Sequence, residues 1–157
     1  MKKAVLFFYV MVGIFLLLGV SLYLFIHSSS TDYNFEILSS EIERDVRIVF
    51  DDMAVPHIYA ESETDAMFAL GYVHASERLW QMDLLRRAGA GELSALLGSD
   101  MVENDQYLRT LGMRDAADRA TVAFQANAAV EIQASAAAYF AGVNRFIDQG
   151  KTPLEYV

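Results

Sequence analysis

The chain has 157 residues, a formal net charge of −9 at pH 7, and no cysteine. This length gives room for one modest domain and an appendage, and the absence of cysteine excludes disulfides, thiolate nucleophiles and cysteine-ligated metals. Because Lys2 and Lys3 contribute two positive charges to the total and are the only charged residues among the first 30, residues 31–157 carry −11, which argues against binding of nucleic acid or of anionic lipid head groups.

The first predicted element is an apolar helix. Residues 4–26 contain no charged side chain, and a helix of this length spans roughly 30 Å, enough to cross a bilayer. A cleavable signal peptide has a shorter apolar core and a small-residue cleavage site, for which the following "HSSS" is a poor match. For residues 1–27 we therefore favour a membrane anchor over a signal segment. The lysine pair would stay in the cytoplasm, so an inner-membrane anchor would leave the domain facing the periplasm or the cell exterior.

A polar, serine-rich stretch, residues 28–43, is interpreted as a tether. The domain proper, residues 44–157, begins with two short runs at 45–51 and 55–60 that alternate and are rich in β-branched residues, which predicts a β-hairpin with its turn between them. Pro56 indicates an edge strand or a strand start. A lone hairpin is marginal in water, and the chain supplies no other convincing strand, so we expect this hairpin to join a larger sheet.

The remaining residues have helical periodicity. Ser62 or Thr64 is the candidate N-cap of the longest helix, and the Gly-Ala-Gly at 89–91 is expected to stop it. Residues 101–125 should form one or two helices with a break near Gly112, and Gly150 is the expected C-terminal signal of the last helix. The predicted helical segments lie at about 64–88, 92–97, 101–125 and 127–149.

The longest of these helices carries apolar residues on two opposite sides of its helical wheel. A surface helix shows one apolar stripe, so two stripes indicate a helix packed on both sides. Between them lies a polar seam in which His74 is within reach of Glu77 and Arg78, and Asp83 is similarly spaced for ion pairs with the arginines at 86–87. The rest of the chain is too short to cover such a helix, which indicates a part of something larger.

No set of side chains completes an active site on its own. His74 and Glu77 have the spacing of two metal ligands on one helix face, but zinc needs a third protein ligand, and the other histidines lie at the tether (His27) and in a predicted strand (His57). As a general base, His57 has no neighbouring serine or cysteine to activate. We find no nucleophile elbow, phosphate loop or dinucleotide fingerprint. We therefore predict no catalytic, cofactor-binding or metal-binding residue in this chain.

From residue 45 onward, the sequence resembles the start of the first chain of the penicillin acylase (penicillin amidase) family of N-terminal-nucleophile hydrolases. The similarity covers about residues 45–157, in order and at normal spacing. Two departures are Ala54, where the family has glycine, and the pair at 76–77, where Gln-Asp is usual. The words that carry the resemblance are "VPHI", "GYVHA", "RLWQM", "LLRR", "DQYLRTLGM", "YFAGVNRFID" and "TPLEYV".

Together with the N-terminal transmembrane helix predicted above, this resemblance implies an α+β fold, in which a β-hairpin and mostly α-helices follow that helix and belong to a larger αββα sandwich. It implies a precursor several times this length, which cuts itself to expose a serine at the start of a second chain. That serine, with its own α-amino group as base, would hydrolyse the amide bond of a penicillin-like or other N-acyl compound. The family's nucleophile, oxyanion hole, acyl pocket and calcium ligand all fall beyond Val157.

The partners implied are therefore the membrane, through residues 4–26, the missing second chain, and a small-molecule N-acyl substrate, with no nucleic acid. We expect no cofactor in this fragment, although many complete family members bind calcium. The chain stops in mid-pattern, as a truncated gene, a sequence fragment or a frameshift would, and we predict that it is inactive alone. A second interpretation stays open: a catalytically inactive, membrane-tethered helical interaction module, or a truncated pseudo-enzyme.

Overall fold

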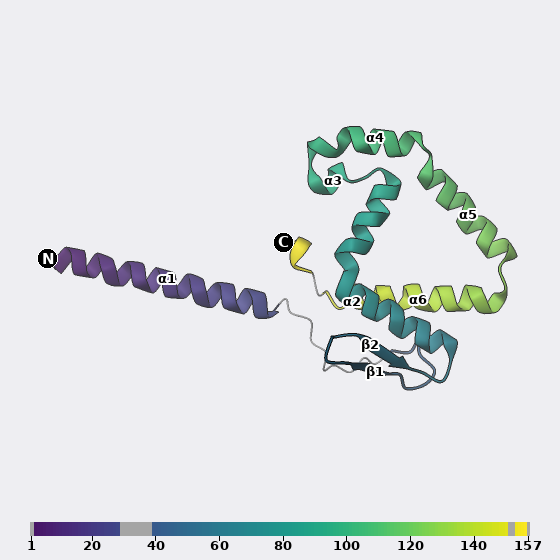
Figure 1. The fold of residues 1–157 in the computed structure, drawn as a ribbon, viewed down its shortest axis with the longest axis horizontal. Helices are drawn as coiled ribbons and strands as arrows, with labels where there is room; N and C mark the ends of the chain where they lie inside the picture. The colour runs from purple at the N-terminus through teal and green to yellow at the C-terminus, as the bar shows by residue number, and fades with distance from the viewer. Residues whose placement is uncertain (1, 29–38, 151–152, 157) are drawn as a thin grey trace. The chain divides into compact units, whose positions relative to one another are not determined.

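The computed structural model describes residues 2–28, 39–150 and 153–156, and the chain divides into two units, residues 1–34 and 35–157. The first unit contains one helix, α1 (Lys2–Ser28) (Figure 1). Within it, Val5–His27 is long and apolar enough to cross a membrane, with a mean hydropathy of 2.6 and no buried residue. A signal sequence has the same properties, so the choice between anchor and signal segment stays a prediction. Most of the predicted tether, residues 29–38, lies outside the described residues.

The second unit begins with the predicted hairpin. Strands β1 (Arg47–Phe50) and β2 (Pro56–Tyr59) pair antiparallel, with Ile48 opposite Ile58. Alternate residues of each strand are partly buried and exposed, as the sequence pattern predicts. These are the only strands in the described part of the chain, and the expected larger sheet is not formed by it.

Helix α2 (Glu63–Ala90) follows the hairpin, and its ends are set by local signals. Of the two candidate caps, Ser62 is the N-cap: its hydroxyl oxygen accepts a hydrogen bond from the backbone N–H of Asp65 at 3.0 Å. Gly91 ends the helix in a left-handed conformation, with φ 66°. The helix is kinked at Arg78, whose φ of −139° is not helical, whereas the sequence predicts an uninterrupted helix here.

The rest of the unit is helical as predicted. Gly112, with φ 66°, separates two helices within the third predicted segment, and Gly150, with φ 68°, follows the last long helix. Figure 1 shows that the intervening helices lead away from the end of α2 and return to α6. These elements are α3 (Ser94–Leu97), η1 (Ser99–Met101), α4 (Val102–Thr110), α5 (Met113–Asn127), α6 (Val130–Asp148) and η2 (Leu154–Tyr156).

The core lies where α2 crosses α6, the two helices that pack together most extensively. Two glycines allow this close approach: a Cβ atom on Gly71 would overlap the carbonyl oxygen of Tyr139, and one on Gly142 would overlap that of Phe68. Beside the crossing, the buried core cluster consists of Tyr72, Ala75, Val143 and Phe146.

Burial is confined to one half of α2. Before the kink, residues from both predicted apolar sides are buried, including Val73 on one side and Tyr72 on the other. After the kink, no residue of α2 is fully buried, and α5 has no buried residue at all. The prediction of a helix packed on two sides is therefore met within this chain only for the first half of α2.

Candidate functional site

The two histidines of the second unit both have polar partners. In the hairpin, His57 Nε2 lies 3.3 Å from Asp51 Oδ2, and both side chains are exposed. In α2, His74 Nδ1 lies 3.1 Å from the hydroxyl oxygen of Tyr139 on α6. These contacts fit a structural role for both histidines, because neither is hydrogen-bonded to a serine or threonine among the described residues.

In the structure, His74 has a different hydrogen-bond partner from those predicted for it within the polar seam. The helical wheel, which considers one helix alone, put Glu77 and Arg78 within reach of His74, whereas the observed partner is Tyr139 on a different helix. Glu77 instead has a buried Oε1 with no hydrogen-bond partner among the described residues. Within that same part of the chain, no three acidic or histidine side chains are grouped as metal ligands, and the absence of a metal site from the whole chain stays a prediction.

The serine hydroxyls near α2 support the backbone or join helices. Ser76 Oγ donates to the carbonyl oxygen of Val73 at 2.9 Å, and Ser135 Oγ donates to Glu63 Oε1 at 2.9 Å, which ties α6 to the start of α2. Ser62 is occupied as the N-cap. None of these three hydroxyls contacts a histidine, and the one carboxylate partner, Glu63, joins two helices, so these contacts are those of a scaffold.

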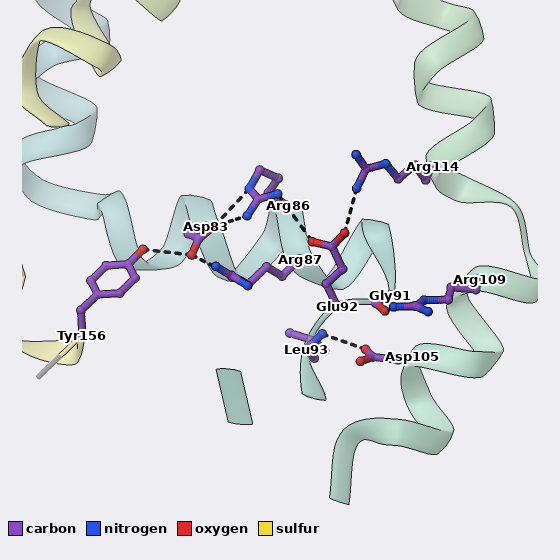
Figure 2. Close-up of polar contacts among 10 residues, drawn as sticks. All are labelled: Asp83, Arg86, Arg87, Gly91, Glu92, Leu93, Asp105, Arg109, Arg114 and Tyr156. Atoms are coloured by element: carbon purple, nitrogen blue, oxygen red, sulfur yellow. Dashed lines mark hydrogen bonds and ion pairs between the residues drawn. The ribbon is translucent and has the colours of Figure 1, made fainter. Parts of the chain in front are cut away.

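A polar cluster surrounds Asp83 in the second half of α2 (Figure 2). The Asp83 side chain is 16% exposed and accepts hydrogen bonds from Arg86 at 2.7 Å and from Arg87 at 2.9 Å, which confirms the ion pairs predicted from their spacing. Tyr156, 73 residues further along the chain, donates a hydrogen bond from its hydroxyl to Asp83 Oδ2, with 3.2 Å between the two oxygens. This third partner has no signal in the local sequence of α2.

The charges of this cluster reinforce one another. Burial raises the pKa of Asp83, but the hydrogen bonds from Arg87 and Arg86 outweigh it, so this pKa lies below its ordinary value. The pKa of Tyr156 is raised by burial and by the negative charge of Asp83. At neutral pH, Asp83 is therefore ionised and Tyr156 keeps the proton that it donates.

A second cluster holds the turn after α2. Asp105 on α4, only 4% exposed, accepts hydrogen bonds at 2.8 Å from the backbone N–H groups of Leu93 and Ser94. One turn further along α4, Arg109 Nε donates to the carbonyl oxygen of Gly91 at 2.8 Å. A Cβ atom on Gly91 would crowd the Asp105 carbonyl oxygen and the Arg109 side chain, so this glycine is required by packing and by its φ.

Asp105 and Arg109 belong to the segment "DQYLRTLGM", for which the sequence predicted no specific contact. Asp105 and Arg109 are four residues apart and share one face of a helix, but this spacing does not predict the backbone groups that they bind. Glu92, in the same turn, links α2 to α5: its carboxylate lies 3.8 Å from Arg86 and 2.9 Å from Arg114 on α5 (Figure 2). The two clusters together fix α3, α4 and α5 against the end of α2.

An apolar groove lies between the second half of α2 and α6, with a cavity volume of about 590 Å³. Its polar lining residues are Asp83, Arg86 and Tyr156. Phe140, on its α6 side, is 62% exposed. The groove can bind apolar groups, but its lining offers no paired acid and base for catalysis. Its main apolar residues are Leu79, Met82, Phe140, Val143 and Ile147.

Comparison with known proteins gives one consistent family. The family model described as "Penicillin amidase" matches residues 45–157. Penicillin acylase 2 proenzyme from Pseudomonas sp. (strain SE83) is 42% identical over 112 residues, which are 71% of this chain and 14% of that protein. Acyl-homoserine lactone acylase QuiP from Pseudomonas aeruginosa is 36% identical over 106 residues, covering 68% of this chain and 12% of QuiP.

A solved structure has a similar fold. Thermostable penicillin G acylase from Alcaligenes faecalis superimposes with a TM-score of 0.60 and 28% sequence identity, over 71% of this chain and 60% of that one. Penicillin G acylase from Escherichia coli is 33% identical over 73% of this chain, which again is only 13% of that protein. The chain thus spans about one seventh of the length of the curated relatives that it matches.

Proposed function

The chain belongs to the penicillin amidase family, and we propose that it is the N-terminal part of an acylase-type amidohydrolase that hydrolyses the amide bond of N-acyl compounds. The observation that carries this proposal is the continuous family match over residues 45–157. Relatives named as penicillin acylases and as acyl-homoserine lactone acylases both support the acylase class, and the substrate can be penicillin-like or another acyl amide.

The catalytic step is proposed to use a serine at the start of a second chain, outside the sequence given. Its hydroxyl would attack the amide carbonyl with the free α-amino group as base, so that proteolytic release of that amine makes the enzyme active. The name proenzyme, carried by the relative from Pseudomonas sp., supports such a maturation. None of the side-chain clusters described above is proposed to take part in the chemistry.

The role proposed for this chain is to form the outer helices of a larger αββα sandwich. The hairpin would extend a sheet, because two strands alone bury too little apolar surface to be stable. The second half of α2 and the exposed Phe140 would pack against the second chain, since large apolar side chains around an open groove are typical of surfaces that other polypeptide covers. If calcium is bound, its ligands would also come from outside this chain.

Helix α1 is proposed to hold the protein at the inner membrane, with residues 44–157 facing the periplasm or the cell exterior. Its length and uninterrupted apolar composition support this role, as does the lysine pair before it. A carbonate wash of membranes, followed by intact-mass measurement, distinguishes an uncleaved anchor, which stays in the pellet with its first residues, from a cleaved signal segment.

The proposal is tested by reading the gene past codon 157 and by an enzyme assay. We expect a continuation of the reading frame, direct or after one frameshift, that encodes a cleavage junction followed by serine. The 157-residue chain alone should not hydrolyse a chromogenic N-acyl amide, while the complete protein should. Measurable turnover by the chain alone would refute the assignment of the nucleophile to a second chain, and a gene without any such continuation would favour the inactive interaction module.

A further inference from the structure

Tyr156 fastens the segment Pro153–Tyr156 to α2 by two different contacts. Its hydroxyl donates to Asp83 Oδ2 at 3.2 Å, and its ring packs edge-to-face on Trp80, with ring centroids 5.0 Å apart and planes at 85°. Trp80 and Asp83 lie three residues apart on one face of α2. The tyrosine is therefore fixed both in position and in the direction of its hydroxyl.

The acceptor is prepared for this contact by its neighbours. Arg86 and Arg87 hold the Asp83 carboxylate in place by ion pairs. Arg86 also faces Glu92, so Asp83 shares this arginine with a second carboxylate. Hydrogen bonds to an ionised carboxylate are stronger than those between neutral groups.

We propose that Tyr156 is a latch, which closes one side of the apolar groove by its hydrogen bond to Asp83 and its contact with Trp80. Tyr156 and Pro153 both line the groove, together with residues of α2 and α6 such as Met82 and Phe140. Releasing Tyr156 therefore opens the groove where this side chain lines it, and exposes Trp80. The proposal stands on contacts within this chain and does not depend on the proposed enzymatic function.

Trp80 is the only tryptophan in the chain, so its fluorescence reports on the latch directly. The test measures acrylamide quenching of Trp80 in the full chain, held in detergent micelles. Tyr156→Phe keeps the ring and should lower the ratio of closed to open latch about tenfold, the effect of losing one hydrogen bond to a charged group. Tyr156→Ala also removes the ring contact, so quenching should rise from wild type to Phe to Ala.

A double-mutant cycle identifies the acceptor. If the hydroxyl acts through Asp83, Asp83→Asn should increase quenching as Tyr156→Phe does, and combining the two changes should add little. The matched control is Tyr107→Ala, which truncates an exposed tyrosine on α4 and should leave quenching unchanged while circular dichroism confirms the helices. Unchanged quenching in Tyr156→Ala, equal quenching in wild type and Tyr156→Phe, or full additivity in the cycle would each overturn the latch.

Discussion

At the scale of single residues, Ala54 in the hairpin turn has an unfavourable backbone conformation. Ala54 has φ 58°, a left-handed conformation in which the Cβ atom of an L-residue is crowded. It is held there by a tight turn, in which Asp51 Oδ1 accepts hydrogen bonds from the backbone N–H groups of Met53 and Val55, both at 2.9 Å. The glycine that the resembling family has at this position is therefore explained by backbone geometry.

Replacing Ala54 by glycine should stabilise the hairpin by roughly 0.5–1 kcal/mol, because relief of the left-handed conformation outweighs the greater freedom of glycine in the unfolded chain. Hydrogen exchange of the Ala54 amide, which donates to the Asp51 carbonyl oxygen at 2.9 Å, measures this local stability. Slower exchange at position 54 is expected. Faster exchange would show that the turn is not strained.

Asp105 makes the turn after α2 sensitive to acid. Burial raises its pKa, but hydrogen bonds from Ser94 and Leu93 outweigh it, and the pKa lies below the ordinary value of 3.8. Its contribution to the free energy of unfolding is therefore fully present above 3.8 and is lost as the pH falls through the lower folded pKa.

We expect Asp105→Asn to lower the melting temperature at about pH 5, with the difference from wild type shrinking towards about pH 2 as the wild-type carboxyl also becomes neutral. Thermal unfolding followed by circular dichroism at several pH values measures this difference. Asp118→Asn, on the exposed face of α5, is the matched control and should have little effect. A difference for Asp105→Asn that does not change with pH would contradict the role of the charge.

At the scale of elements, the helix ends and turns could be predicted because their signals are local. Ser62 caps α2, and Gly91 and Gly112 end helices with the left-handed conformations that glycine favours. The kink at Arg78 could not be predicted, since no proline or glycine pair marks it. The Asp105 hydrogen bonds and the Tyr156 contact with Asp83 were also missed, because each joins residues from different elements whose pairing depends on the tertiary fold.

The crossing of α2 and α6 requires glycine at both contact positions. Gly142→Ala would place a Cβ atom against the Phe68 carbonyl oxygen. Because the atoms nearest to this Cβ all belong to the α2 backbone, which cannot rotate away as a side chain can, the two helices must separate. We expect a loss of about 1–3 kcal/mol of stability, typical of overpacking. Gly89→Ala, in α2 with open space around it, is the matched control and should stabilise by up to about 1 kcal/mol through helix propensity. Chemical denaturation of both variants tests this, and equal effects would contradict the tight crossing.

At the scale of the molecule, the described second unit buries little beyond the α2–α6 crossing. Large apolar side chains on α2, α4, α5 and α6 are exposed, among them Leu85 at 73% and Val130 at 77%. Where such side chains gather, as around the groove between α2 and α6, the surface is typical of one covered by other polypeptide. The two-sided apolar pattern of α2 and the lone hairpin predicted that other polypeptide covers part of this chain. The sequence could not indicate which surfaces remain open, because that depends on how α6 packs.

The central claim, that residues 44–157 are the outer part of a larger catalytic sandwich, is tested most directly by the surface of the chain without its apolar N-terminal helix. A protein beginning at residue 28 should bind a hydrophobic dye strongly and self-associate in analytical ultracentrifugation, because its open apolar faces have no cover. A compact monomer that melts cooperatively and leaves the dye unbound would contradict the account.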